Sequence, residues 1–494
     1  MSDSDAEHSV DDSSSAAAVT SGFGRKVLLN SAQLGGSLVV AWTMSLVGRF
    51  LLPRVLGTER FGELALMESV ATLVLSLMAF GVHEFIGKEV AVDEAAAQRF
   101  AQPLFRLQLT SGVGLAVATG LVVAATSGAE LALVVSVFAL AQINIVLGKV
   151  YAAYLQARHE AAVVSLSAVV TKVVWLVLLL ALLGAGAELL ALPVALVISE
   201  LVRTVWLARG FRASFGPAQA APMSAATEVV KRSLPHYINA LNVDVMSYSV
   251  RILVGVLGGV AAAGVFSAAL LAASVPMLLT PVLGWIAIPV LSNLREAGAD
   301  EMWARVGSIT DSLAPVVVAA GVGLFAFSDT LLPLLFGDDF ASSGPAFAWL
   351  ALTMPATYFT QLVGSAFIAD DRSWQNTKVN LYTLIFVVVG VVFVLVLDGS
   401  DDPGRLALLT AVVVAAGEWI TVIALLVLRP YRAVTTPTIV RFALLAAVGI
   451  VAAAEKLGDD RTELRWAVLA VAVVVAASDV PRLLVTVRRL LADR

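Results

Sequence analysis

Residues 49–65 read RFLLPRVLGTERFGELA, and residues 251–269 read RILVGVLGGVAAAGVFSAA. Each stretch begins with an arginine, Arg49 or Arg251, near the end of one apolar segment and continues through glycines into the next segment. The recurrence indicates an internal duplication. The fold therefore depends on what these apolar segments are and how many of them the chain contains.

Glycines define the pattern in both copies. A Leu-Gly pair follows the arginine after seven or eight residues and ends in Gly57 in the first copy and in Gly258 in the second. After a short turn a second glycine, Gly62 or Gly264, opens the next helix. Both copies occupy the same place in a set of six segments, so we expect repeats of the same orientation, related by an axis along the membrane normal.

The composition indicates a membrane protein. Of the 494 residues 59% are hydrophobic and 14% are charged, and the mean hydropathy is +0.90, against roughly 45–50% apolar residues in a soluble domain. Apolar runs of about 20 residues recur along the chain, and only helices or closed barrels span a bilayer. Strict alternation of apolar and polar residues is absent, which favours helices. The net charge of −5 gives no basic surface for nucleic acid.

The fold class is therefore all-α, a polytopic membrane protein with 14 transmembrane helices. We expect two six-helix lobes in a pseudo-twofold arrangement plus two C-terminal helices. The predicted spans are 27–48, 64–86, 104–125, 131–153, 162–183, 189–208, 234–256, 262–291, 307–327, 346–368, 376–397, 406–428, 438–455 and 466–486.

The domain organisation follows from the spans and from the polar joints between them. We predict a disordered acidic tail at 1–24, an N-lobe at 25–210, a cytoplasmic linker at 211–233, a C-lobe at 234–430, and helices 13 and 14 with a cytoplasmic C-terminus at 431–494.

Basic residues orient the chain. With the N-terminus inside, 23 of the 32 Lys and Arg residues fall in cytoplasmic segments and 7 in outside segments. Lys and Arg accumulate in cytoplasmic loops. The bias predicts an even number of spans, cytoplasmic N- and C-termini, and insertion in the cytoplasmic (inner) membrane.

Four stretches resemble a known family. They occur in the family's order, as LGTERFGELALMESV at 56–70, LGGVAAAGVFSAAL at 257–270, IPVLSNLREAGADEMWARV at 288–306 and LLPLLFGDDFASSGPAFAWLAL at 331–352. The sequence is similar to the polysaccharide and oligosaccharide-lipid flippases (Wzx-like) of the multidrug/oligosaccharidyl-lipid/polysaccharide (MOP) exporter superfamily. The resemblance implies two six-helix bundles in a V shape, a central cavity, and alternating access that moves a lipid-linked saccharide for surface polysaccharide biosynthesis. It implies a transporter and not an enzyme, with no cofactor.

Asp244 and Arg251 are charged residues inside a predicted span. Seven residues place two side chains within about 20° of each other around a helix and roughly 10 Å apart along it. Tyr248 lies between them on the same polar stripe. Each charge near the bilayer centre costs about 2.5–3.5 kcal/mol. The stripe therefore either lines a wet cavity, or Arg251 extends to the interface while Asp244 pairs with another helix.

Arg49 and Lys172 are further candidates for substrate binding. Arg49 occupies in the first lobe the place of Arg251 in the second, and a guanidinium gives two hydrogen bonds to a diphosphate or an acidic sugar. Interfacial placement of both arginines remains the alternative. Lys172 falls in the middle of a predicted span, where an ammonium needs water or a counter-charge.

Carboxylates in the spans could carry a coupling ion. Glu68 is the clearest candidate in the first lobe. It either holds a coupling proton or forms a structural ion pair with Lys172 or Arg49. Asp244 and Glu418 are candidates of the same kind. Proton or sodium coupling is accordingly expected.

Prolines interrupt the eighth predicted span. Pro276, Pro281 and Pro289 each remove a backbone hydrogen bond, which kinks a helix. We expect this segment to bend as the lobes move.

Other polar residues favour structural roles. Glu200 and Arg203 are three residues apart, which predicts a local ion pair. The loop pair Asp370 and Asp371 is expected to lie in a solvated turn. Scattered histidines and the absence of cysteine give no metal site.

Rival functions remain open. A cation-coupled multidrug exporter and a peptidoglycan-precursor lipid flippase of the same superfamily share the fold. A glycosyl polymerase or ligase would carry a large external loop, which the sequence lacks. Expected partners are the lipid-linked saccharide, membrane lipids, H+ or Na+, and a polysaccharide polymerase or glycosyltransferase.

Overall fold

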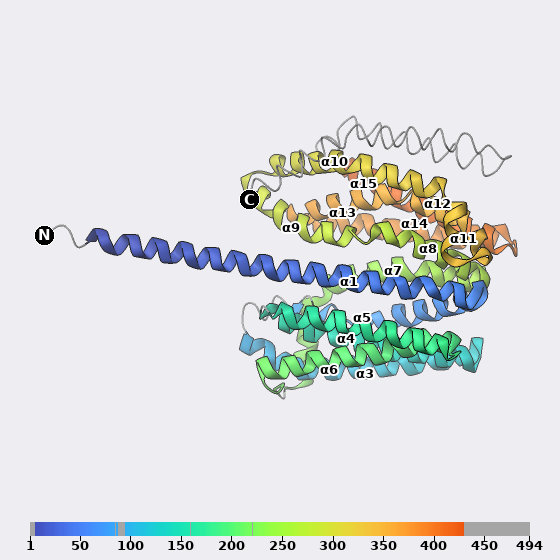
Figure 1. Ribbon diagram of the computed structural model, residues 1–494, viewed down its shortest axis with the longest axis horizontal. Helices are drawn as coiled ribbons and strands as arrows, with labels where there is room; N and C mark the ends of the chain where they lie inside the picture. The colour runs from blue at the N-terminus through green and yellow to red at the C-terminus, as the bar shows by residue number, and fades with distance from the viewer. Residues whose placement is uncertain (1–4, 84, 87–93, 159, 220, 429–494) are drawn as a thin grey trace. The chain divides into compact units, whose positions relative to one another are not determined.

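The structure is a computed structural model that describes residues 5–83, 85–86, 94–158, 160–219 and 221–428. Every regular element in these ranges is helical (Figure 1). The elements are α1 (Asp5–Ser76), α3 (Glu94–Ser127), α4 (Ala129–Ala157), α5 (Ala161–Gly184), α6 (Glu188–Phe215), α7 (Met223–Leu257), α8 (Val260–Met277), α9 (Thr280–Ala297), α10 (Ala299–Ala326), α11 (Ser328–Phe336), the 3₁₀ helix η1 (Asp338–Ser343), α12 (Gly344–Ala351), α13 (Met354–Ala369), α14 (Ser373–Asp398) and α15 (Pro403–Leu428).

Nine helices of the described ranges are long and apolar enough to cross a membrane. They are α3, α4, α5, α6, α7, α8, α10, α14 and α15, and they fall on the predicted spans three to nine, eleven and twelve. The all-helical membrane fold is thus confirmed. The predicted helices at 438–455 and 466–486 lie outside the described residues, so the total of 14 stays a prediction.

Two predicted spans are divided in the structure. The span expected at 262–291 consists of α8 and α9, with the break between Pro276 and Pro281. The span expected at 346–368 consists of α12 and α13, and Pro355 stands in the first turn of α13. Proline at a helix start is favourable because its missing N–H has no partner there in any case.

Two helices extend into the linker predicted at 211–233, which itself stays a prediction. Helix α6 continues to Phe215 and α7 begins at Met223. At the N-terminus, α1 begins at Asp5, and the tail predicted at 1–24, whose side chains lie outside the described residues, stays a prediction.

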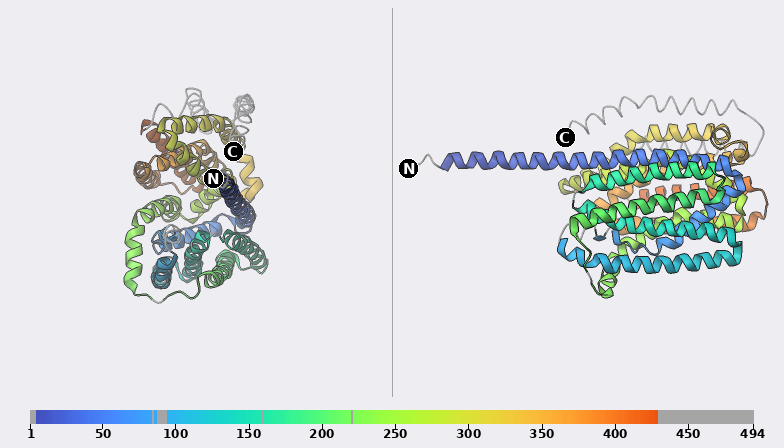
Figure 2. Two further views of the ribbon diagram at one scale, coloured as in Figure 1. Left: turned by 90° about the vertical axis from the view of Figure 1, so that its left-hand side faces the viewer. Right: turned by 60° about the horizontal axis from the view of Figure 1, so that its bottom comes forward.

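The backbone forms two compact units, which are described separately. The first comprises residues 1–48, 77–120 and 136–237, and its helices α3, α4, α5 and α6 lie alongside one another (Figures 1 and 2). Its core contains a cluster of aromatic rings in which Phe211 lies 5.1 Å from both Tyr154 and Phe215.

The second unit comprises residues 49–76, 121–135 and 238–494. Its core holds Trp303 of α10, Phe359 and Phe367 of α13 and Leu425 of α15. Trp303 and Phe367 pack edge to face with their ring centroids 5.4 Å apart. Non-polar contacts between helices thus determine its interior.

The two sequence copies meet within the second unit. A Cβ on Gly62 would lie 1.8 Å from the carbonyl oxygen of Val260, and a Cβ on Gly264 would lie 2.0 Å from that of Thr58. Each copy therefore places its glycine against the backbone of the other copy, at Val260 or Thr58. Each of these two residues directly follows the glycine of a turn. Only glycine permits so close an approach.

The turns in the two copies have the same backbone conformation. Gly57 has φ 71° and ψ 178°, and Gly259 has φ 85° and ψ 164°. The sequence pairs Gly57 with Gly258, and that pairing is wrong by one residue. Gly259 is the counterpart, because positive φ at this point favours glycine.

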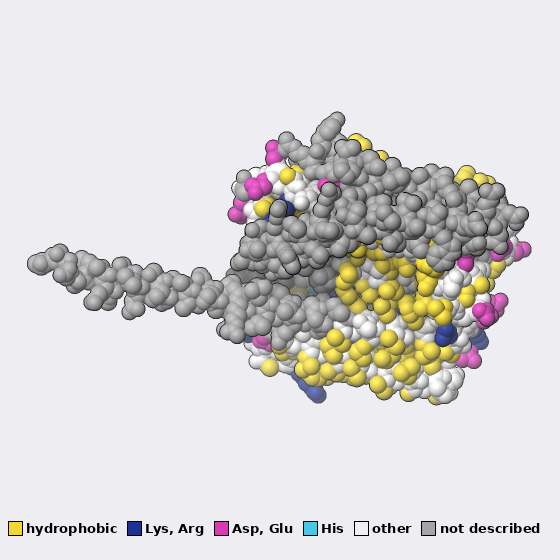
Figure 3. Space-filling model, turned by 45° about the horizontal axis from the view of Figure 1, so that its top comes forward, with side chains coloured by type: hydrophobic (Ala, Val, Ile, Leu, Met, Phe, Trp, Pro, Cys, Tyr) yellow, Lys and Arg dark blue, Asp and Glu magenta, His cyan; other side chains and the backbone are white. Residues whose placement is uncertain are grey.

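The described surface carries many hydrophobic side chains. Figure 3 shows them over much of the described part of this face, with charged side chains mainly near its edges. Exposed examples are Leu121, Val177 and Val396, at 67%, 61% and 63% exposure. Such a surface suits lipid contact.

Candidate functional site

Arg49 and Glu68 form an ion pair across the turn of α1. Arg49 lies eight residues before Gly57 and Glu68 eleven residues after it. The Nη2 and Nη1 atoms of Arg49 lie 2.5 Å and 3.2 Å from the two carboxylate oxygens of Glu68. The Glu68 side chain is 13% exposed and that of Arg49 35%. Arg49, one of the two structural partners predicted for Glu68, forms an ion pair with it, and a role of Glu68 in ion coupling stays a prediction.

Arg251 of α7 lies next to this ion pair. Its guanidinium interacts electrostatically with Glu68, Tyr248 and Arg49. The guanidinium carbon stands 5.5 Å from the centroid of the Tyr248 ring. The buried Nε of Arg251 has no hydrogen-bond partner among the described residues.

Tyr248 connects the members of the group. It interacts electrostatically with Glu68, Arg251, Arg49 and Asp244. These five residues, which we call the paired-arginine site, come from both sequence copies and all belong to the second unit. The site holds two guanidinium groups and two carboxylates within the apolar part of the helices, an arrangement that can receive an anion.

Lys172 belongs to the first unit. It lies on α5, and its Nζ stands 5.6 Å from the centroid of the Trp175 ring. This cation–π contact is one way to stabilise an ammonium in an apolar helix. A role of Lys172 in substrate binding stays a prediction.

Glu418 lies on α15, facing α13. It is half-buried and hydrogen-bonded to Thr357. An acid with a neutral partner in an apolar helix is a candidate for holding a proton or a cation. Its part in coupling stays a prediction.

The predicted hinge prolines surround the break between α8 and α9. Pro276 stands in the last turn of α8, Pro281 in the first turn of α9 and Pro289 within α9. The hydroxyl of Tyr358 on α13 donates to the carbonyl oxygen of Pro276 at 2.8 Å. The break is therefore held by a side-chain bond from a neighbouring helix.

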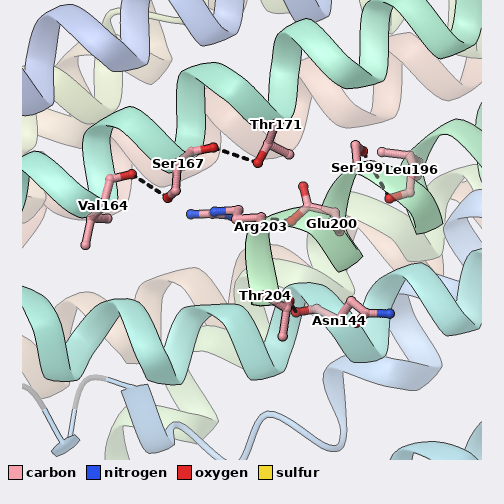
Figure 4. A network of polar contacts seen from close by, with 9 residues as sticks. All are labelled: Asn144, Val164, Ser167, Thr171, Leu196, Ser199, Glu200, Arg203 and Thr204. Carbon is pink, nitrogen blue, oxygen red and sulfur yellow. Dashed lines mark hydrogen bonds and ion pairs between the residues drawn. The ribbon is translucent and has the colours of Figure 1, made fainter. Parts of the chain in front are cut away.

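The first unit contains a second polar cluster (Figure 4). Arg203 and Glu200 of α6 are turned toward the face of α5 that carries Ser167 and Thr171. Arg203 Nη1 lies 3.5 Å from a carboxylate oxygen of Glu200, whose side chain is 6% exposed. The predicted local ion pair is confirmed, and its burial exceeds what the spacing indicates.

Asp370 contradicts the sequence interpretation. We expected a solvated turn, but the residue is 7% exposed. Its carboxylate accepts hydrogen bonds from Arg295 Nε at 2.7 Å and Trp303 Nε1 at 3.3 Å. The pair joins α13 to α9 and α10. In the sequence, the two basic residues of the stretch 288–306, Arg295 and Arg305, are the one indication of a partner.

No group of three or more metal-ligating side chains occurs among the described residues. The sequence expectation of no metal site stays a prediction for the whole chain.

Comparison with known proteins places the chain in a family. The sequence family described as polysaccharide biosynthesis protein matches residues 51–345, well over half of the chain. This range contains Glu68 and Arg251. No curated protein matches the sequence.

Several solved structures share the fold. The lipid II flippase MurJ, in an inward closed conformation, is 10% identical with a TM-score of 0.65, covering 94% of this chain and 100% of its own. An inward-facing multidrug resistance MATE family transporter of the MOP superfamily is 14% identical with a TM-score of 0.57, covering 83% and 99%. A MOP superfamily transporter from Pyrococcus furiosus is 14% identical with a TM-score of 0.53, covering 84% and 96%.

The matched sequence range, the apolar helices and the shared fold agree with the resemblance found in the sequence. The chain is a multi-pass membrane protein with the fold of MOP superfamily transporters, and it belongs to the polysaccharide biosynthesis protein family.

Proposed function

We propose that this chain flips a polyprenyl-diphosphate-linked oligosaccharide across the cytoplasmic membrane by alternating access, as a step of surface polysaccharide biosynthesis. The observation that carries the proposal is the paired-arginine site, in which the buried Nε of Arg251 has no hydrogen-bond partner in the described part of the chain. A guanidinium donates two parallel hydrogen bonds to phosphate oxygens. Family membership supports the saccharide part of the substrate.

The transport cycle uses the charged head group and leaves the lipid tail in the bilayer. The head group enters from the cytoplasmic side and binds at Arg251 of the paired-arginine site, with Tyr248 beside it, and Lys172 is a further candidate for substrate binding. The lobes then reclose toward the other side, and the helix break near Pro276, Pro281 and Pro289 bends during this movement. Both chain termini remain in the cytoplasm, and a polysaccharide polymerase or glycosyltransferase takes or delivers the cargo.

A proton or a sodium ion drives the cycle. The carboxylates proposed to carry it are Asp244, Glu68 and Glu418. The membrane potential supplies about 2.3 kcal/mol per elementary charge per 100 mV. One translocated cation is thus enough to bias the direction of transport.

A variant series tests the proposal in cells. Deletion of the gene should abolish surface glycan, and the native chain should restore it. At equal protein level in the membrane, Arg251→Lys should restore part of the glycan because it keeps the charge, and Arg251→Ala should restore none. Full glycan with Arg251→Ala would remove the paired-arginine site from the transport cycle.

A second candidate is transport of a peptidoglycan precursor, favoured by the fold similarity to a lipid II flippase. This function predicts that depletion of the protein stops cell-wall synthesis while surface glycan outlasts it. A multidrug exporter predicts intact glycan and raised sensitivity to cationic drugs. The same deletion strain distinguishes all three functions.

A further inference from the structure

The structure aligns the two sequence copies without gaps. Each arginine is followed after eight residues by the glycine of positive φ and after five more by the glycine of the close contact. A shift of 202 residues maps Arg49 on Arg251, Gly57 on Gly259 and Gly62 on Gly264.

The same shift exposes a difference between the copies. Position 68 in the first copy is a glutamate, and its counterpart in the second copy is Leu270. The carboxylate that pairs with Arg49 therefore has no counterpart at the equivalent position of the second copy. The duplicated framework carries two arginines and a single matching acid.

The contacts of the two arginines differ accordingly. Arg49 places two guanidinium nitrogens on the two oxygens of Glu68, at 2.5 Å and 3.2 Å. Arg251 lies over the Tyr248 ring and has an unpaired Nε. Arg49 thus directs two of its N–H donors to Glu68, whereas the buried Nε of Arg251 has no hydrogen-bond partner among the described residues.

We propose that the arginines have different roles, Arg251 binding the phosphate of a diphosphate-lipid head group and Arg49 acting as a positioning residue that holds Glu68 away from Arg251. This assignment rests on the proposed function, since it concerns the same site and the same anionic ligand.

The mechanism is a competition for Arg251. Glu68 already interacts with Arg251 as well as with Arg49. After removal of Arg49, the Glu68 carboxylate can pair with Arg251, with which it already interacts. A carboxylate paired with Arg251 occupies the donors that a phosphate needs.

A rescue experiment tests the assignment. The purified full-length chain is titrated with polyprenyl diphosphate, and polyprenol serves as the ligand control that lacks phosphate. Arg49→Ala should weaken diphosphate binding at least about tenfold, a loss of about 1.4 kcal/mol. Adding Glu68→Ala to that variant should restore affinity to within about threefold of the native chain. A purely structural role would lower the unfolding midpoint of Arg49→Ala and restore it in the double variant, so the loss and recovery of binding must occur at an unchanged midpoint.

Two further variant pairs serve as controls. The double variant Arg49→Gln with Glu68→Gln keeps the side-chain volumes and should also bind like the native chain. Arg203→Ala with Glu200→Ala removes a comparable ion pair from the first unit and should leave affinity unchanged. Each variant must elute as one species and unfold cooperatively.

The outcomes distinguish failure of the role assigned to Arg49 from failure of the proposed function. If both double variants at positions 49 and 68 bind as weakly as Arg49→Ala, Arg49 itself contacts the ligand and the assignment is overturned. An equal loss in the Glu200 and Arg203 control overturns it as well. If Arg251→Ala binds polyprenyl diphosphate like the native chain, the proposed function fails, whatever Arg49 does.

Discussion

Glu418 is an acidic side chain in apolar surroundings. It lies in the apolar helix α15 with a hydrogen bond to Thr357 and no salt bridge to a described residue. An isolated carboxylate is costly to bury in an apolar environment. Retaining an acid here is consistent with exchange of a proton or a cation at this position.

Replacing Glu418 by Gln should uncouple transport from its driving gradient. The amide keeps the shape and the contact with Thr357 but cannot release a proton or hold a cation. An imposed gradient should then no longer accelerate movement of the lipid-linked saccharide in proteoliposomes, while binding of polyprenyl diphosphate stays within about twofold.

Glu200→Gln is the control for Glu418→Gln, because it also removes an acidic group from an apolar helix. Its transport should still respond to the gradient. A full response in Glu418→Gln would exclude this residue from coupling.

At the scale of helices, the glycine contact determines how α1 and α8 meet. The atoms that a methyl group would strike are backbone oxygens of Thr58 and Val260. Backbone atoms cannot rotate away as a side chain does, so the two helices would have to separate. The contact therefore fixes the register that places Arg49 and Arg251 in one site.

Gly264→Ala should destabilise the protein by about 1–3 kcal/mol, the usual cost of overpacking. We expect a lower thermal unfolding midpoint and weaker diphosphate binding. Gly114→Ala is the control, because nothing lies within 4 Å of its added methyl group and alanine favours helix. Equal midpoints for Gly264→Ala and the native chain would show that the contact is not close in solution.

The helices themselves could be predicted because long apolar runs allow few alternatives in a bilayer. The positions of the breaks could not. Prolines mark the region around α8 and α9, but the helix ends at Met277 and resumes at Thr280 because of contacts such as the bond from Tyr358. Such bonds connect residues remote in sequence, and local pattern does not reveal them.

The candidate site could be predicted only in part, because some of its contacts join residues that are remote in the sequence. Helical periodicity grouped Asp244, Tyr248 and Arg251 on one stripe, and duplication pointed to Arg49. The pairing of Glu68 with Arg49 depends on the turn at Gly57, which brings the two residues together. The spacing of residues in the sequence does not predict this pairing. The burial of Asp370 was missed because its partners stand on other helices.

At the scale of the whole molecule, the account depends on one claim: the charged side chains within the membrane helices border water. The alternative is a set of ion pairs sealed in dry helix contacts, which would give stability but no transport. Because the chain contains no cysteine, single cysteines can report on water access without further changes.

The most direct measurement compares two single-cysteine variants of α7 in membranes, Tyr248→Cys and Val243→Cys. The two positions lie about 140° apart around the helix, and Val243 is 54% exposed on the described surface. A charged, water-soluble thiol reagent should modify position 248 much faster than position 243, and polyprenyl diphosphate should protect it. Modification of position 248 no faster than of position 243 would contradict the account.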